Sequence, residues 1–356
     1  MSRGPRYRRA KAVTPARRLL ISTTTALAVL GAAALLLGIW AVWTFAGPGP
    51  RAREGQSTTV ILRTGAGLPE IASTLRAAHV ISSGPIFVAA SELTGAAKHM
   101  KAGEYEFRSG ASMATVIARI RDGKVVRHLI TIPEGVPSVM VAEILQRADF
   151  LTGSAPEPPE GSVLPETYEA RRGEDRAAVL QRMMDARDKL LASLWTQRRT
   201  DLPYQSPDQA VILASIVEKE TAKPDERPRI AAVFVNRLQH GMRLESDPTI
   251  IYGLTRGRPL GHGITAQEKN THTPYNTYFV DGLPPTPIGN PGRASLAAAL
   301  DPPRTDELFF VADGTGGHVF SSTVDQHNEN VKRWREIEKA RAAAHPPAAA
   351  APAKGR

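Results

Sequence analysis

The chain has 356 residues, of which 42% are hydrophobic, with a formal net charge of +10 and no cysteine. This length is enough for two or more packed modules, and the lack of cysteine excludes thiol catalysis and cysteine-bound zinc. Seven of the ten excess positive charges lie within residues 1–18, so the remainder is only mildly basic and nucleic-acid binding is disfavoured. The nine histidines show no HExxH spacing, and neither a metal site nor a cofactor is predicted.

The first predicted element is a transmembrane helix over residues 19–46. This stretch contains no charged residue, and about 20 apolar residues are enough to cross a bilayer as a helix. Trp40 and Trp43 lie near its end, where indole rings favour the membrane interface. Because the basic tail at residues 1–18 precedes the helix, the positive-inside rule places the N-terminus in the cytoplasm. A cleaved signal peptide is the alternative, but its apolar region is usually shorter.

A weak internal repeat follows a predicted linker at residues 47–57. Gly65, Gly110 and Gly135 each precede apolar residues at matching offsets, although Ser138 interrupts the third copy. Each unit is predicted to be a short strand, a glycine turn and an amphipathic helix. Such a unit cannot bury its apolar stripe alone, so the copies are expected to pack together or onto a sheet. A structural module and a glycan-binding module are both open interpretations.

The most informative stretch is residues 212–238, "ILASIVEKETAKPDERPRIAAVFVNRL". It begins as a helix that is apolar on all sides, which is typical of a buried helix. Glu218 follows directly, and the small side chains of Ala214 and Ser215 leave room beside its carboxyl. Burial raises the pKa of a carboxyl, and a protonated carboxyl is what a glycosidic leaving oxygen needs from a general acid. Glu218 is therefore the predicted acid.

Glu220 lies about 200° from Glu218 around the helix axis, so the two cannot act on one sugar ring. A structural ion pair is the commoner role of a glutamate in a helix. We expect this role for Glu220, with Arg227 or Arg237 as its partner.

The segments after residue 240 mix acidic, aromatic and amide side chains. Glu245 and Asp247 are predicted to line one side of an extended segment, although Asp-Pro also fits a turn or a helix start. The stretch 273–302 contains tyrosine and asparagine, which suit carbohydrate because rings stack on sugar faces and amides bond hydroxyl and acetamido groups. Residues 307–328 predict two strands joined by "DGTGGH".

Four motifs stand in one order, "ILASIVEKET", "RLESDPTIIYG", "YNTY…GLPP…NPG" and "FFVADGTGGHVFSSTVDQHN". Together they resemble the endolytic peptidoglycan transglycosylases of the MltG/YceG-like family over roughly residues 55–335. The resemblance implies an α+β fold made of a single membrane helix, a LysM-like module and a catalytic domain. The predicted divisions are a cytoplasmic tail at 1–18, the membrane helix at 19–46, a linker at 47–57, the LysM-like module at 58–130, the catalytic domain at 131–338 and a disordered tail at 339–356.

The resemblance also implies the reaction, which is cleavage of the β-1,4 bond between N-acetylmuramic acid and N-acetylglucosamine to leave a 1,6-anhydro end. One glutamate suffices, and it maps onto Glu218 through "SIVEKE". The residues in family motifs that we expect to line the groove are Glu245, Asp247, Tyr252, Tyr275, Asn276 and Thr277. The implied partners are peptidoglycan strands and peptidoglycan synthases of the penicillin-binding class, on the outer side of the inner membrane.

Three residues depart from the family pattern. Glu245 stands where glutamine is common, Glu166 where aspartate is common, and Thr286 where glycine is common. The departures put substrate preference in doubt rather than reaction type. A non-catalytic peptidoglycan-binding scaffold is the alternative function, because the anchor and the repeats alone would serve it. An anchored protease lacks any serine elbow motif in the sequence.

Overall fold

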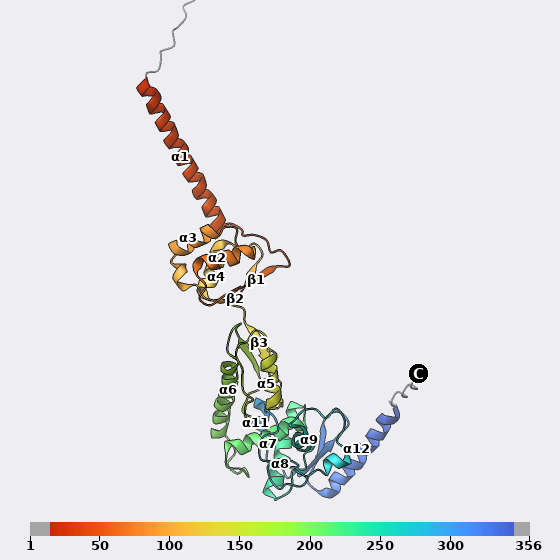
Figure 1. Ribbon diagram of the computed structural model, residues 1–356. Helices are drawn as coiled ribbons and strands as arrows, with labels where there is room; N and C mark the ends of the chain where they lie inside the picture. Colours follow the sequence, from red (N-terminus) through yellow and green to blue (C-terminus); the bar gives the residue numbers. More distant parts are fainter. Residues whose placement is uncertain (1–14, 345–356) are drawn as a thin grey trace, which may run out of the picture. The chain divides into compact units, whose positions relative to one another are not determined.

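The structure is a computed structural model that describes residues 15–344 (Figure 1). The chain forms two compact units, residues 1–126 and 127–356. Most of the basic tail expected at residues 1–18 and the end of the tail expected at 339–356 lie outside the described residues. The mixture of helices with three small antiparallel sheets confirms the predicted α+β class.

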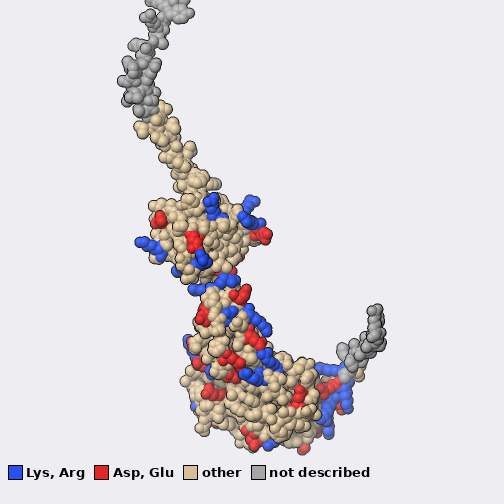
Figure 2. Space-filling model, in the orientation of Figure 1, with Lys and Arg blue, Asp and Glu red and all other residues tan. Residues whose placement is uncertain are grey.

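The first unit begins with α1, Pro15–Ala46, a single long helix. Its part Thr25–Ala46 has 22 residues with a mean hydropathy of 2.2, and none of its most apolar window is buried. Figure 2 shows no charged side chain along this stretch. An exposed apolar helix of this length is long enough to cross a membrane.

A small α+β module follows α1 within the first unit. Its sheet pairs β1, Ser57–Leu62, with β2, Gly103–Arg108, in an antiparallel register that places Val60 opposite Tyr105. Between the two strands lie α2, Leu68–Ala77, α3, Gly84–Leu93, and η1, Ala96–His99, and after them comes α4, Met113–Asp122. Tyr105 and Phe87 are fully buried at its centre because the apolar faces of the helices close over the sheet.

The second unit contains the remaining elements. They are β3 His128–Thr131, α5 Ser138–Arg147, β4 Thr167–Ala170, α6 Arg176–Thr196, α7 Pro207–Glu220, η2 Pro224–Glu226, α8 Arg227–Gln239, α9 Asp247–Thr255, α10 Ala266–Lys269, α11 Arg293–Leu300, β5 Phe309–Ala312, β6 His318–Ser321 and α12 Val324–Ala344. The β5–β6 pair confirms the hairpin predicted around "DGTGGH". α12 is helical through the first part of the segment expected to be disordered.

The structure confirms the strand–glycine–helix repeat. Gly65, Gly110 and Gly135 adopt φ values of +81°, +77° and +72°, the left-handed region that favours glycine. Each glycine is followed by a ten-residue helix, α2, α4 and α5 respectively. The first two copies pair their strands with each other, whereas β3 of the third copy pairs with β4 in the second unit.

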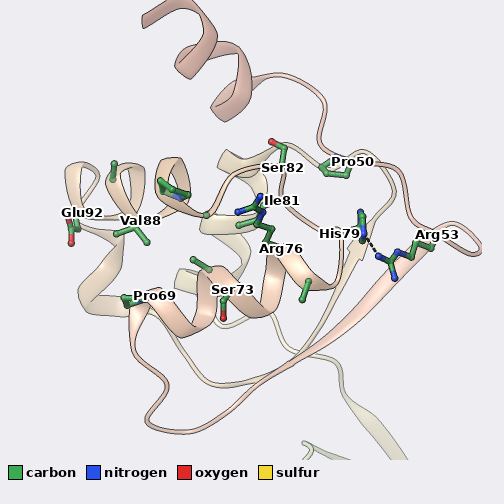
Figure 3. A pocket seen from close by; sticks show the side chains of 15 residues that line it. Pro50, Arg53, Pro69, Ser73, Arg76, His79, Ile81, Ser82, Val88 and Glu92 are labelled. Atoms are coloured by element: carbon green, nitrogen blue, oxygen red, sulfur yellow. Dashed lines mark hydrogen bonds between the residues drawn. The ribbon is translucent and has the colours of Figure 1, made fainter. Parts of the chain in front are cut away.

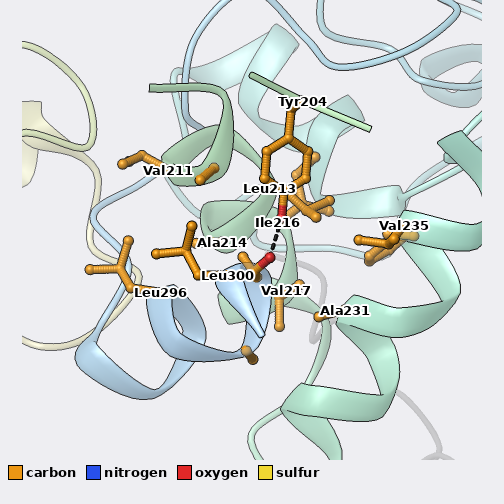
Figure 4. Close-up of a cluster of buried hydrophobic side chains, with 14 of the residues drawn as sticks. Tyr204, Val211, Leu213, Ala214, Ile216, Val217, Ala231, Val235, Leu296 and Leu300 are labelled. Carbon is orange, nitrogen blue, oxygen red and sulfur yellow. Dashed lines mark hydrogen bonds between the residues drawn. The ribbon is translucent and has the colours of Figure 1, made fainter. Parts of the chain in front are cut away.

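The helix α7 forms the centre of the second unit, as its all-round apolar sequence predicted (Figure 4). It starts with a capping box in which Ser206 and Gln209 each bond the backbone of the other. Its buried side chains pack against Val235 of α8 and Leu296 of α11. This packing fixes where the end of α7, and therefore Glu218 and Glu220, must lie.

Candidate active site

The carboxyl of Glu218 is enclosed at the end of α7, with only 4% of the side chain exposed. Its Oε1 accepts a hydrogen bond from Arg227 Nη2 at 2.8 Å. Its Oε2 accepts one from the backbone N–H of Gly292 at 2.8 Å, directly before α11. Both oxygens are therefore engaged, and the room expected beside this carboxyl is filled by a cation and a helix N-terminus.

Arg227 also binds a second acidic residue, because its Nη2 lies 2.9 Å from Glu134 Oε2. Glu134 comes from the turn that contains Gly135, the third copy of the repeat. A Cβ on Gly135 would lie 3.3 Å from Glu218 Cγ, and a Cβ on Gly292 would lie 2.0 Å from Glu134 Oε1. The backbone thus approaches the ion pair from two sides, and Glu218 has the structural role that we expected of Glu220.

Glu220 is instead half-buried, and its Oε1 accepts a hydrogen bond from the Ser246 hydroxyl. Burial, together with the nearby Asp247 carboxylate, raises the pKa of Glu220 to about 7 against the opposing effects of Ser246 and Arg237. The expected ion pair is wrong, because Arg227 binds Glu218 and Arg237 lies 3.2 Å from Glu245 Oε2.

Ser246 is held in place by two buried threonines. The Ser246 N–H donates to Thr277 Oγ1 at 2.9 Å, and Thr249 Oγ1 donates to the Ser246 carbonyl at 2.6 Å. The two threonine hydroxyls also contact each other at 2.9 Å. Thr277 is 0% exposed, so it positions Ser246 and cannot line a groove as predicted.

Asp247 and Tyr278 complete the surroundings of Glu220. The Tyr278 hydroxyl donates to Asp247 Oδ1 at 2.8 Å. Burial and the carboxylates of Asp247, Glu245 and Glu220 all raise the pKa of Tyr278 above its usual value. Asp247 begins α9, so the helix start is correct and the extended segment is wrong. Asp247 and Glu245 are both exposed, in keeping with a place beside a substrate.

Tyr252 and Tyr275 belong to a different polar cluster, centred on Glu160. The Tyr252 hydroxyl donates to Glu160 Oε2 at 3.0 Å, and the two tyrosine rings are 4.8 Å apart. Tyr275 bonds Thr286 at 2.9 Å. Burial raises the pKa of Glu160, whose Oε1 also accepts the Ser138 N–H at 2.9 Å. None of these contacts involves Glu220.

Asn276 is also not available to a ligand. It is 0% exposed, and its Nδ2 donates to the carbonyls of Lys269 and Thr271 at 3.0 and 2.8 Å. Its Oδ1 accepts the Tyr278 N–H at 3.1 Å. The prediction that Asn276 binds sugar is therefore contradicted, because all its polar atoms hold the loop that carries Tyr278.

Sequence reasoning missed Ser246, Tyr278 and Glu134, and it did not predict that Glu218 rather than Glu220 forms the ion pair with Arg227. The only sequence signal for Tyr278 was its place among tyrosine and asparagine residues. The partners of Glu218 lie 9 and 74 residues away along the chain. No local pattern indicates such contacts.

Comparison with known proteins supplies independent evidence. The model of the YceG-like family matches residues 60–333. The chain is 27% identical over 320 residues to an endolytic murein transglycosylase of Bacillus subtilis, covering 80% of this chain and 87% of that protein. It is 26% identical to one from Streptococcus pneumoniae, covering 79% of this chain and 59% of that protein. A crystal structure of a YceG-like protein of Listeria monocytogenes is similar with a TM-score of 0.50 and 28% identity, over 77% of this chain and 98% of that one.

Proposed function

Because this chain belongs to the YceG-like family, we propose that it is an endolytic murein transglycosylase. It cleaves the β-1,4 bond between N-acetylmuramic acid and N-acetylglucosamine inside a glycan strand and leaves a 1,6-anhydro end. The names of the curated relatives support the activity. The observation that carries the chemistry is the half-buried carboxyl of Glu220, whose pKa lies at about 7.

Glu220, rather than Glu218, is the acid in this proposal. In its protonated form it donates a proton to the glycosidic oxygen, and the bond from that oxygen to muramoyl C1 breaks. The resulting carboxylate then takes the proton of the muramoyl C6 hydroxyl as that oxygen bonds C1. The acid is thereby restored and no water is consumed, so the second carboxyl of a hydrolase is not needed.

The neighbours of Glu220 suit this role. The Ser246 hydroxyl bonds Oε1, which leaves Oε2 to carry the transferred proton. The exposed carboxylate of Asp247 accepts a hydrogen bond from Tyr278 at 2.8 Å. Its negative charge disfavours ionisation of the nearby Glu220, which therefore keeps its proton before the substrate binds. The same carboxylate stabilises positive charge that develops on the sugar ring during cleavage.

Glu218 has a positioning role in this proposal. Through Arg227 and Gly292 it connects the end of α7 to the starts of α8 and α11. Arg227 links it further to the turn of the third repeat through Glu134. These contacts set the direction in which the last turn of α7, and with it Glu220, points.

The helix α1 is proposed to anchor the enzyme in the inner membrane, with its N-terminus in the cytoplasm. The support is its length and mean hydropathy of 2.2 together with the basic residues before it. An anchored enzyme acts close to the membrane, where synthases of the penicillin-binding class extrude new glycan strands. Cleavage there would end strand elongation, and the module at 58–130, which is proposed to be LysM-like, is proposed to contact the same strand.

End-group analysis tests the proposal. The purified full chain is incubated with isolated glycan strands, and the fragments are analysed by mass spectrometry. Fragments with 1,6-anhydro ends are expected, whereas hydrated reducing ends would identify a hydrolase. Strand binding without any fragment would support the alternative, a non-catalytic scaffold.

A further inference from the structure

The last turns of α1 pack against the module that follows. Phe45 contacts the hydrophobic core of the module, and Val42 lines an apolar depression together with Ile86 and Leu93 of α3. About 20 apolar residues span the hydrocarbon core of a bilayer. The end of the stretch Thr25–Ala46 therefore reaches the lipid–water interface when α1 crosses a membrane, and α3 must lie at that interface.

The composition of α3 suits that place. Leu93 is 88% exposed, and Glu92 is the only charged residue of the helix. A large apolar side chain with this exposure is unfavourable in water but is stabilised among lipid headgroups and the first acyl carbons.

A hollow of about 960 Å³ opens between α2, α3 and the segment after α1 (Figure 3). Arg53 and His79 lie at one end, where Arg53 donates a hydrogen bond to the His79 ring, and Arg76 lies between this end and Val88. Glu92 lies at the opposite end. Much of the lining between the two ends is apolar, including Val88. The hollow therefore offers a cationic end and an apolar wall.

The segment that carries Arg53 lies within the linker predicted at residues 47–57 and is held by backbone hydrogen bonds to the module. The Gly49 N–H donates to the Gly110 carbonyl at 3.1 Å, and the Gly110 N–H donates to the Pro50 carbonyl at 3.0 Å. A Cβ on Gly49 would lie only 2.1 Å from the carbonyl oxygen of Ala111. This close contact holds the cationic end of the hollow a short distance beyond the end of α1.

We propose that this hollow binds the phosphate of an anionic membrane lipid, while α3 lies in the headgroup layer beside the end of α1. Guanidinium groups match phosphate oxygens in charge and geometry. The apolar wall suits the glycerol and first acyl carbons of the same lipid. The inference depends on α1 spanning the membrane and is independent of the cleavage reaction, so failure of either can be recognised separately.

Lipid retention by the full chain tests the hollow. The protein in detergent is mixed with phosphatidylglycerol or phosphatidylcholine, and bound lipid is counted by native mass spectrometry. Each arginine near an anionic headgroup contributes about 1 kcal/mol, so the Arg53→Gln, Arg76→Gln pair should weaken phosphatidylglycerol binding about 30-fold. The Arg108→Gln, Arg121→Gln pair removes the same charge outside the hollow and should bind as the parent does.

Three outcomes would overturn the proposal. If both double variants bound phosphatidylglycerol equally weakly, the lipid would be attracted by overall charge and not by the hollow. If phosphatidylcholine were retained as well as phosphatidylglycerol, the protein would not recognise the anionic charge. Displacement of the lipid by inorganic phosphate or by a soluble stem peptide of peptidoglycan would identify a different ligand.

A second measurement places α3 directly. The chain has no cysteine, so Leu93→Cys gives a single site for a nitroxide label in the full chain within a bilayer. Its relaxation should respond to dissolved oxygen more than to a water-soluble nickel reagent. A label at Thr59→Cys, exposed on β1 and outside the residues that line the hollow, serves as the comparison. A water-exposed signal at position 93 would refute the interfacial location of α3.

Discussion

At the scale of single residues, Glu218 and Glu220 differ in their partners rather than in their sequence context. Both belong to the last turn of the buried helix α7, yet Arg227 and Gly292 donate hydrogen bonds to both oxygens of Glu218 and to neither oxygen of Glu220. Glu220 has the Ser246 hydroxyl on its Oε1 and a pKa of about 7. An acid must hold a proton near neutral pH, and the raised pKa of Glu220 is the reason that we propose it, rather than Glu218, as the acid.

Replacing Glu220 by glutamine should abolish cleavage while preserving the fold. General acid–base catalysis contributes about 10²- to 10⁴-fold to the rate, so the formation of anhydro ends should fall by that factor. The amide has the same shape and can still accept the hydrogen bond from Ser246. Thermal unfolding of Glu220→Gln should match the parent below about pH 4.5, where Glu220 is protonated in the folded and the unfolded state, and retained activity would refute the assignment.

Replacing Glu218 by glutamine should give the opposite pattern. Its amide nitrogen would have to face either Arg227 or the Gly292 N–H, and both are donors. An unsatisfied buried donor costs about 1–3 kcal/mol, measurable as a lower urea midpoint with an unchanged slope. The protein that remains folded should keep a large part of its activity. Loss of all activity at unchanged stability would return the acid role to Glu218.

The pH dependence of cleavage follows from the raised pKa of Glu220. Only the protonated form donates, so kcat/KM should fall as the pH rises through about 7. Asp247 raises this pKa, so Asp247→Asn should move the falling limb to lower pH. A pH–rate profile on isolated strands measures both effects, and an unmoved limb would show that Asp247 does not act on the acid.

The same pKa shift affects stability with a defined sign. The pKa of Glu220 is about 7 when folded against 4.5 for the free group, so the folded state binds the proton more tightly. Its contribution is fully present below about pH 4.5 and is lost as the pH rises toward 7. In Glu220→Gln, the free energy of unfolding should not show this decrease between about pH 4.5 and pH 7. Urea unfolding of both proteins across that pH range tests the prediction.

At the scale of elements, the three glycine turns share one backbone conformation but have different neighbours. A Cβ on Gly65 would meet nothing within 4 Å, whereas a Cβ on Gly135 would lie 3.2 Å from Lys219 Cδ and 3.3 Å from Glu218 Cγ. The third turn therefore packs against the end of α7, whereas the first turn has no such contact.

Alanine substitution at the two glycines separates these roles. The left-handed conformation costs about 1–2 kcal/mol for a residue with a Cβ, so Gly65→Ala and Gly135→Ala should each lower the stability of the unit that contains them. Only Gly135→Ala should also reduce cleavage, because it displaces the end of α7. Equal activity in the two variants would show that the turn does not position the acid.

At the scale of the whole molecule, the anchor and the catalytic unit should have separable effects. A chain that starts at residue 48 keeps every residue of the site, so it should cleave isolated strands at the rate of the full chain. In cells lacking the full chain it should fail to shorten new strands, because it is not held at the membrane. Chromatography of strand lengths tests this, and full restoration by the soluble chain would contradict it.

The sequence by itself determined features that depend on neighbours along the chain. The uncharged run at 19–46 predicted an apolar helix, the glycine spacing predicted three strand–turn–helix units, and the all-round apolar pattern predicted that α7 is buried. Each of these signals is local, because helix period and turn conformation depend on adjacent residues. The order of the four motifs along the chain indicated the family in the same way, since it too can be seen in the sequence.

Only the tertiary structure decided which of these polar side chains are paired or buried and which stay accessible. Glu218 contacts Arg227 and Gly292 because α8 and α11 pack on α7. Asn276 and Thr277 are buried, and their side chains hydrogen-bond nearby backbone groups. The pKa of Glu220 reflects the burial produced by segments distant in sequence. Desolvation and ion pairing depend on distances in space, and two glutamates separated by one lysine give no local sign of which will be paired.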